Sequence, residues 1–181
     1  IGSSNDMKLG WNLINGEWYY KYGANLLNGK AEIDGKEYCF ENGIMMKNTA
    51  STANLSEYCY GEDGIRLSGT GWKLLDGKWY YLNSKSEYIT GWAMIGTERY
   101  YFLTEEDCFA EKKTDKINYG RLGVMCTGYR VINGRLCYFD QNGAYRGIRG
   151  CENGWYYAKE ENDWYFMKGQ RVTTGRATVN G

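Results

Sequence analysis

Residues 71–82 read GWKLLDGKWYYL, a stretch in which two Trp and two Tyr surround a central Asp-Gly pair. An Asp-Gly pair readily adopts the positive φ angles of a type I′ turn, which joins two antiparallel strands. Trp and Tyr also favour strands. The stretch therefore predicts a β-hairpin in which Trp72 faces Tyr81 and Leu74 faces Trp79. Because side chains alternate along a strand, these four residues would share one face of the hairpin.

The same pattern recurs along the chain. Residues 10–20 read GWNLINGEWYY, and further aromatic runs follow Asp34-Gly35, Gly96-Thr97 and Asn133-Gly134. Units of about 20 residues start near residues 10, 30, 50, 71, 91, 108, 128 and 150. In this division residues 1–9 are a lead-in, residues 10–174 hold about eight hairpin repeats, and residues 175–181 begin a truncated further repeat.

This periodicity predicts an all-β fold, a solenoid of stacked β-hairpins. An isolated hairpin is marginally stable in water, whereas stacked hairpins bury one another's faces. A glycine after each aromatic run suits a left-handed turn between hairpins, as at Gly43, Gly64, Gly123 and Gly143. A β-sandwich of short strands is the competing fold, but it does not need so regular a repeat. No window has the sustained 3.6-residue period and caps of a helix, so helices are not expected.

The composition excludes several classes of function. The 181 residues include 25 Gly, 18 Tyr and 7 Trp but no Pro and no His, and 22 basic residues balance 22 acidic ones. A neutral chain lacks the basic surface that binds nucleic acids or anionic lipids. No apolar run approaches the roughly 20 residues that span a bilayer, so we expect no membrane insertion.

Nothing in the sequence marks a catalytic, metal or cofactor site. Without His, a Ser-His or Cys-His nucleophile pair is excluded, and no glycine-rich loop for phosphate is present. Glu105-Glu106 and Glu160-Glu161 lie in turn-like text and are interpreted as solvated charge, since nothing marks them as a glycosidase pair. The six Cys show no CxxC spacing. We expect mostly free thiols, with Cys39 and Cys59 as small core substitutes for aromatic rings.

The repeated text resembles a known family. Gly-Trp followed by Trp-Tyr-Tyr, and then Gly with a small residue or Met, is similar to the choline-binding, or cell-wall-binding, repeats of Gram-positive surface proteins. Related repeats occur in glucansucrases, where they bind glucan, and in large clostridial toxins. Residues 128–147, GYRVINGRLCYFDQNGAYRG, look closer to these last two groups. The resemblance implies a left-handed β-solenoid in which two Trp of one hairpin and a Tyr of the next surround a choline group.

The resemblance places candidate cages on matching residues of this chain. The candidate ligand-binding residues are Trp11, Trp18 and Tyr38 for a first cage, Trp72 and Trp79 with Tyr100 or Tyr101 for a second, and Trp155 and Trp164 for a third that a further repeat would complete. Elsewhere the pattern decays. Arg99, Glu37, Glu57 and Ile117 hold the position of the second Trp in other repeats, and a cation at residue 99 would repel choline.

An aromatic cage has a physical reason. A quaternary ammonium donates no hydrogen bond, but aromatic ring faces attract its charge. Each ring contributes on the order of 1 kcal/mol, so three rings give roughly millimolar binding, and several sites on one polymer gain by avidity. Flat Trp and Tyr faces also stack on sugars, so carbohydrate is the alternative ligand for these rings. For most Tyr and Phe, packing in the core is the better interpretation.

The sequence therefore predicts a non-catalytic, extracellular module without cofactors. Its partner would be the choline of cell-wall teichoic acid or a related wall polysaccharide. One alternative is a repeat module that binds α-glucan or host carbohydrate, and another is a structural stalk whose sites have decayed. Residues 175–181, GRATVNG, match the first strand and turn of a hairpin, so the native protein is expected to continue or to have lost the next strand by processing. Each of these functions is compatible with fusion to another domain in the native protein.

Overall fold

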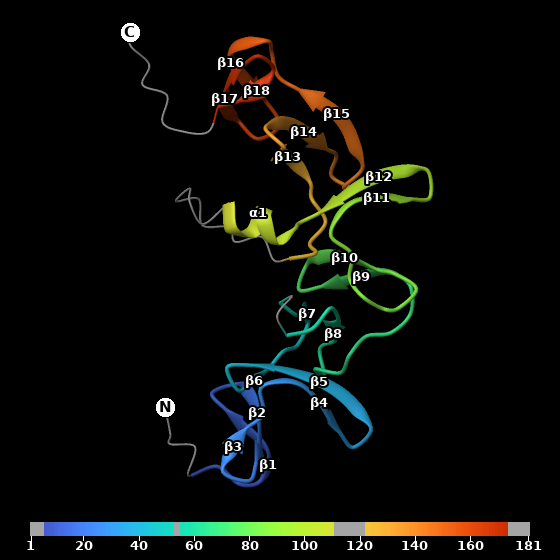
Figure 1. Ribbon diagram of the computed structural model, residues 1–181, viewed down its shortest axis with the longest axis vertical. Helices are drawn as coiled ribbons and strands as arrows, with labels where there is room; N and C mark the ends of the chain where they lie inside the picture. Colours follow the sequence, from blue (N-terminus) through green and yellow to red (C-terminus); the bar gives the residue numbers. More distant parts are fainter. Residues whose placement is uncertain (1–5, 53–54, 111–121, 174–181) are drawn as a thin grey trace. The chain divides into compact units, whose positions relative to one another are not determined.

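The computed structural model describes residues 6–52, 55–110 and 122–173. Strands joined by tight turns dominate these residues, and one short helix lies among them (Figure 1). The elements are β1 (Gly10–Ile14), β2 (Glu17–Tyr22), β3 (Asn25–Leu26), β4 (Gly29–Ile33), β5 (Lys36–Glu41), β6 (Ile44–Met45), β7 (Thr49–Ala50), β8 (Cys59–Tyr60), β9 (Gly71–Leu75), β10 (Lys78–Leu82), β11 (Gly91–Ile95), β12 (Glu98–Phe102), α1 (Glu105–Ala110), β13 (Gly128–Ile132), β14 (Arg135–Phe139), β15 (Tyr145–Arg149), β16 (Asn153–Ala158), β17 (Asp163–Lys168) and β18 (Arg171–Val172). The predicted β fold of successive antiparallel hairpins is confirmed.

The hairpin of β9 and β10 has the predicted register, with Trp72 opposite Tyr81. At its turn, Asp76 and Gly77 have φ angles of 47° and 69°, as a type I′ turn requires. β1 and β2 form a hairpin of the same kind around Asn15-Gly16. The two-residue turn thus fixes which side chains share a face.

Contacts divide the chain into two compact units, which are described separately. The first unit holds β1 to β10 and α1, and the second holds β11 to β18. In the first unit, β1 to β6 form a sheet in the order β1-β2-β6-β5-β4, with β3 beside β2. β7 pairs with β8, and β9 pairs with β10 (Figure 1, blue to green).

One core cluster of the first unit lies on the face of the β9–β10 hairpin that points away from Trp72 and Trp79. Tyr80 is 1% exposed, whereas its neighbour Trp79 is 42% exposed. Tyr80 packs in one cluster with Leu82 and with Cys59 of the preceding repeat. Cys39 and Cys59 are fully buried, which confirms that they are small core substitutes for rings. All six cysteines are free thiols.

Gly64 lets two successive repeats of the first unit approach closely. Its φ angle is 76°, and a Cβ atom at this position would overlap the thioether of Met45. No other residue type combines this backbone conformation with the missing side chain. The glycines predicted to sit at left-handed turns all have positive φ angles: Gly43, Gly64, Gly123 and Gly143.

The second unit contains three antiparallel sheets, β11-β12, β13-β14-β15 and β16-β17-β18. Tyr129, Leu136 and Ala158 form a buried cluster within it. Tyr129 also fixes the turn between β16 and β17. Its hydroxyl donates to Glu160 at 2.6 Å, and its backbone N–H donates to Glu161 at 2.6 Å. Both glutamates lie in an exposed turn, as predicted, and they also accept these hydrogen bonds from Tyr129.

The segment after β12 departs from the expected strand pattern. α1 begins at Glu105 with three acidic residues in its first turn, a placement that the helix dipole favours. The Thr104 backbone N–H donates to Asp107 Oδ2 at 2.9 Å, and the Asp107 N–H donates to Thr104 Oγ1 at 3.3 Å. This reciprocal cap is a capping box. The interpretation of Glu105-Glu106 as a turn is wrong, and the helix was missed because its 6 residues are too few to show a helical period.

Two parts of the predicted repeat division lie outside the described residues. The repeat assigned to residues 108–127 falls largely in residues 111–121, and the truncated repeat at residues 175–181 follows residue 173. The division into about eight repeats stays a prediction. Within the described residues, no helix has the length and apolar character needed to cross a bilayer.

Candidate ligand-binding sites

Three aromatic rings meet beside the first hairpin. Trp11 on β1 and Trp18 on β2 have ring centroids 6.0 Å apart and ring planes at 89°. Tyr38 on β5 belongs to the next hairpin, and its ring centroid lies 5.0 Å from that of Trp11. The structure thus brings together the three residues of the first predicted cage. Their use as a binding site stays a prediction.

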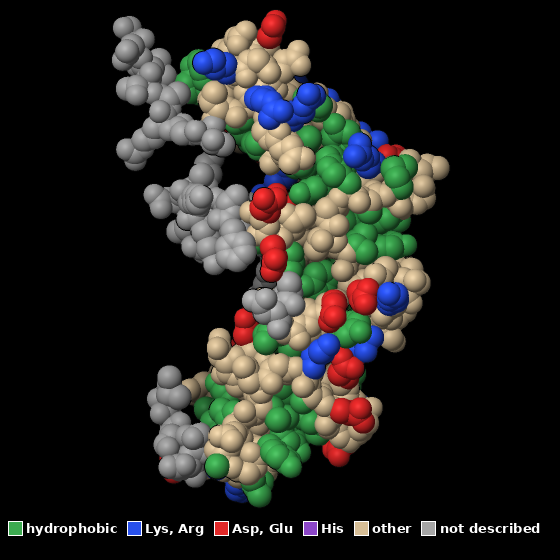
Figure 2. Space-filling model, viewed as in Figure 1, with side chains coloured by type: hydrophobic (Ala, Val, Ile, Leu, Met, Phe, Trp, Pro, Cys, Tyr) green, Lys and Arg blue, Asp and Glu red, His purple; other side chains and the backbone are tan. Residues whose placement is uncertain are grey.

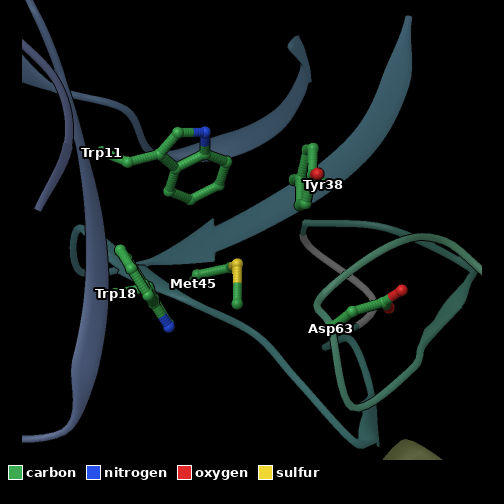
Figure 3. Close-up of a pocket in the computed structure, with 5 residues that line it drawn as sticks. All are labelled: Trp11, Trp18, Tyr38, Met45 and Asp63. Carbon is green, nitrogen blue, oxygen red and sulfur yellow. The ribbon is translucent and has the colours of Figure 1, made fainter. Parts of the chain in front are cut away.

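The three rings line a cavity of about 360 Å³ together with Met45 and Asp63. Figure 3 shows Trp11 and Tyr38 on one side of this space and Trp18 and Met45 on the other. Asp63 comes from the loop that follows β8, and its Oδ1 accepts a hydrogen bond from the Ile65 N–H at 3.0 Å. Burial raises the pKa of Tyr38, and the negative charge of Asp63 acts in the same direction.

The lining of this cavity favours a cation. Ring faces carry the negative side of the aromatic quadrupole, and Asp63 adds a full negative charge at the edge. The thioether of Met45, itself 5% exposed, supplies a polarizable apolar floor. None of the five lining residues is basic. A small cation with an apolar surface, such as a quaternary ammonium, suits all of these features.

The hairpin of β9 and β10 repeats the geometry of the two Trp walls. The ring centroids of Trp72 and Trp79 lie 6.1 Å apart with planes at 89°, against 6.0 Å and 89° for Trp11 and Trp18. Tyr81 supports Trp72 at a centroid distance of 5.2 Å. The predicted face with a Trp pair is therefore present in this hairpin as well.

The third wall predicted for the second cage involves residues of the other unit. Tyr100 lies opposite Ala93 in the hairpin of β11 and β12, just as Tyr38 lies opposite Ala31 in its own hairpin. Tyr101 is 6% exposed, and its ring packs on Trp92 of the same hairpin at 5.1 Å. The completion of the second cage by Tyr100 or Tyr101 stays a prediction.

Trp155 and Trp164 lie on one face of the hairpin formed by β16 and β17. They line a shallow cavity of about 470 Å³. Tyr157 stacks on Trp164 at a centroid distance of 4.9 Å, with the planes tilted by 37°. Phe166 packs on Trp155 at 5.1 Å. These side chains make an open aromatic platform instead of a closed cage. Its completion by a ring of a further repeat stays a prediction.

A family model links this geometry to known proteins. It matches residues 69–112, which hold β9 to β12 and α1, and it describes a choline-binding repeat. Residues 69–112 are similar to a choline-binding repeat. The match includes the Trp72–Trp79 pair and confirms the resemblance on which the cages were predicted.

Similar proteins carry repeats of related kinds. The chain is 34% identical over 92 residues to Toxin A of Clostridium novyi. The aligned region covers 45% of this chain and 4% of the toxin. The chain is 27% identical over 209 aligned positions to Glucosyltransferase-S of Streptococcus mutans. This aligned region covers 99% of the chain and 14% of that enzyme. The chain thus spans a small part of the curated relatives that it matches. The similarity is therefore to parts of two larger proteins.

A solved structure with similarity along most of the chain is choline-binding protein F of Streptococcus pneumoniae, crystallised with a peptidoglycan analogue. It is 25% identical, with 96% of this chain and 54% of that protein covered, at a TM-score of 0.41.

Where the choline-binding repeat pattern decays, arginines lie on aromatic rings. Arg99 takes the place of a second Trp, and its guanidinium carbon lies 4.0 Å from the ring centroid of Trp92. The side chain therefore points over the ring. In the first unit, the guanidinium carbon of Arg66 lies 3.4 Å from the ring centroid of Tyr58. Glu37, also at a second-Trp position, accepts a hydrogen bond from Arg66 Nη1 at 3.0 Å.

The charges around Tyr58 explain why this repeat has no open cage. Glu57 pairs with Lys30 at 3.5 Å, and its pKa is lowered by a backbone hydrogen bond and by the charge of Lys30. Lys30 lies in the register position of Trp11, opposite Cys39. The two Trp positions beside Tyr58 are thus held by Lys30 and Glu37, which form ion pairs with Glu57 and Arg66. Ile117, the other substituted position, lies outside the described residues.

Sequence reasoning missed Met45 and Asp63 as lining residues of the first cavity. Met45 follows the glycine after the aromatic run, so its repeated position was a usable signal. Asp63 lies in a loop of the following repeat, and no local pattern places it beside Tyr38. It reaches the cavity because successive repeats pack against each other.

Proposed function

We propose that this chain is an extracellular binding module that attaches its parent protein to a cell-wall polymer bearing choline, such as teichoic acid. The observation that carries the proposal is the meeting of Trp11, Trp18 and Tyr38 around a cavity edged by Asp63. In this proposal the choline ammonium enters the cavity and its methyl groups contact the three rings.

The lining supports choline over a neutral sugar at this site. A sugar needs hydrogen-bond partners for its hydroxyl groups, and the lining offers mainly ring faces and a thioether. A quaternary ammonium needs negative potential and apolar contact, and both are present. Each site would bind with a Kd of roughly millimolar order, so attachment to a polymer would depend on several sites acting together.

A choline titration tests the proposal. Choline chloride is added to the intact chain while Trp fluorescence and thermal unfolding are followed. We expect saturation in the millimolar range and a rise in Tm, because ligand binding stabilises the folded state. Trp11→Ala should weaken the first site about tenfold, since it removes one wall of the cage.

A matched control separates the cage from general aromatic effects. Tyr22 ends the same hairpin and is 74% exposed, and it is not among the residues that line the cavity. Tyr22→Ala should leave the choline response unchanged. If Trp11→Ala and Tyr22→Ala give the same titration curve as the parent protein, the cage proposal is wrong.

A second candidate function is glycan binding at the platform of Trp155, Tyr157 and Trp164. These side chains are 44%, 41% and 57% exposed, so a flat face larger than one ammonium group is open to solvent. Such a face can stack on a pyranose ring. Dextran and isomaltose oligosaccharides should then quench Trp fluorescence in the parent protein but less in Trp164→Ala. A response to choline alone would remove this candidate.

A further inference from the structure

Arg99 occupies the place that a cage Trp occupies in the first hairpin. Trp18 lies opposite Leu13 across β1 and β2. Arg99 lies opposite Met94 across β11 and β12, at the same step from the turn. Both side chains therefore project from equivalent points on the face that carries the first Trp.

The rest of the cage is preserved around Trp92. Its ring lies 5.1 Å from Tyr101, and Trp11 lies 5.1 Å from Tyr20. Trp92 lies 5.7 Å from Phe139 with planes at 33°. The equivalent pair in the first cage, Trp11 and Phe40, lies 5.9 Å apart at 34°. The two indoles are thus held by the same arrangement of supporting rings.

The third wall is present too, although it comes from a different strand position. Tyr145 lies 5.0 Å from Trp92, the same separation as that of Tyr38 from Trp11. Tyr145 pairs with Phe139 across the strands as Met45 pairs with Phe40. Tyr145 therefore occupies the position of Met45, which forms the floor of the first cavity. Compared with the first cage, a ring has replaced the floor methionine and can close the site.

The charged end of Arg99 lies where a ligand cation would lie. Its guanidinium carbon is 4.0 Å from the Trp92 centroid and 5.7 Å from the Tyr145 centroid. Among the residues that the structure describes, no carboxylate forms an ion pair with Arg99, and the adjacent Glu98 binds Arg146 instead, at 3.0 Å. The two ring faces are therefore the contacts that hold the guanidinium.

We propose that Arg99 is an internal cation that fills the Trp92–Tyr145 cage and excludes external ammonium ligands from this repeat. The site is a latent choline site, and residue 99 decides whether it is open. That the excluded ligand is choline rests on the proposed function. That Arg99 fills the cage rests on the geometry around Trp92.

Substitution of Arg99 tests the inference in the intact chain. The background is Trp11→Ala with Trp72→Ala, in which the first and second predicted cages are damaged. We expect Arg99→Trp to add one choline equivalent, with a Kd within about threefold of that of the first cage, because three rings are restored. Arg99→Ala should add a weaker site, since two rings remain. Tetramethylammonium chloride should give the same pattern as choline chloride.

Met94→Trp is the matched control, because Met94 is the cross-strand partner of Arg99 and is 65% exposed. It adds an indole to the same hairpin outside the cage and should add no choline equivalent. If Arg99→Trp gives no more binding than Met94→Trp while the first cage of the parent protein titrates, the inference is overturned.

A spectroscopic measurement distinguishes this failure from failure of the proposed function. The Arg99 Nε–Hε resonance, assigned by its loss in Arg99→Lys, should be shifted upfield by the Trp92 ring current. That shift should disappear in Trp92→Leu. If the parent protein binds no choline but the ring-current shift is present, the proposed ligand is wrong and the internal cation stands. If the shift is absent, the internal cation is wrong whatever the titration shows.

Discussion

The ring centroids of Trp11 and Tyr38 lie 5.0 Å apart with their planes at 69°, although the two residues belong to successive hairpins. The first cage therefore forms only where one repeat packs on the next. Figure 2 shows hydrophobic side chains lying between acidic and basic ones on one face of the molecule.

The ring of Tyr38, and not its hydroxyl, should determine choline affinity. Tyr38→Phe is expected to keep the affinity of the first site within about twofold, whereas Tyr38→Ala should weaken it by about fivefold to tenfold because one ring face is lost. Fluorescence titration of both variants measures the difference. Equal affinities for Phe and Ala at this position would show that Tyr38 is not a wall of the site.

The charge of Asp63 should strengthen binding of cations. Asp63→Asn keeps an oxygen that can accept the hydrogen bond from the Ile65 N–H, so the loop should be preserved. Loss of the charge is expected to weaken choline binding by roughly twofold to fivefold at low salt, with a smaller effect at high salt because ions screen exposed charges. Isothermal titration at two ionic strengths measures this. Glu62→Gln, at the neighbouring exposed residue outside the cavity lining, is the control and should have no such effect.

The close approach at Gly64 should make this position intolerant of any side chain. Gly64→Ala is expected to lower the free energy of unfolding by roughly 2–4 kcal/mol, because it combines a left-handed backbone with overlap at Met45. Gly69 has a φ angle of 85° and open space around its Cα, so Gly69→Ala should cost only about 1–2 kcal/mol. Denaturant unfolding compares the two. Equal losses would contradict the steric argument.

Asp140 should make the turn between β14 and β15 sensitive to acid. Burial alone would raise its pKa, but hydrogen bonds from the Ala144 N–H and from Arg146 place it below the ordinary value of 3.8. The unfolded chain then binds a proton more readily than the folded one. The stability that Asp140 contributes is complete above the unfolded pKa and is lost as pH falls through the lower folded value.

Thermal unfolding between pH 7 and pH 2 measures this contribution. We expect the Tm of the parent protein to fall more steeply below about pH 4 than that of Asp140→Asn, whose side chain does not ionise. At pH 7 the variant should be less stable, because its bond to Arg146 at 2.8 Å loses its charge. Parallel acid profiles for the two proteins would show that Asp140 does not control this response.

The hairpins and their registers could be predicted because their determinants are local. A two-residue turn such as Asp76-Gly77 fixes the pairing of every residue beside it, and alternation then places Trp72 and Trp79 on one face. The short helix α1 was missed although Thr104 and Asp107 carry a readable capping signal. That signal is only four residues long and competes with the expectation of another strand.

The contents of each site could not be predicted because they depend on how neighbouring repeats pack. Asp63 and Arg66 reach aromatic rings of the preceding or same repeat from a loop, and loops carry little pattern. Tyr145 lines the cage around Trp92, although it occupies the strand position that Met45 occupies beside the first cage. An alignment of the repeat sequences would not predict a third wall at this position. Whether Arg99 points toward Trp92 or toward solvent is likewise decided by this packing.

The contact between Met45 and Gly64 has a consequence for oxidative damage. Met45 lines the first cavity, and its thioether occupies the volume that a side chain at Gly64 would need. Conversion of the thioether to a sulfoxide would place a polar oxygen on the apolar floor of this cavity. Peroxide should therefore weaken choline binding at the proposed first site, and a methionine sulfoxide reductase should restore it.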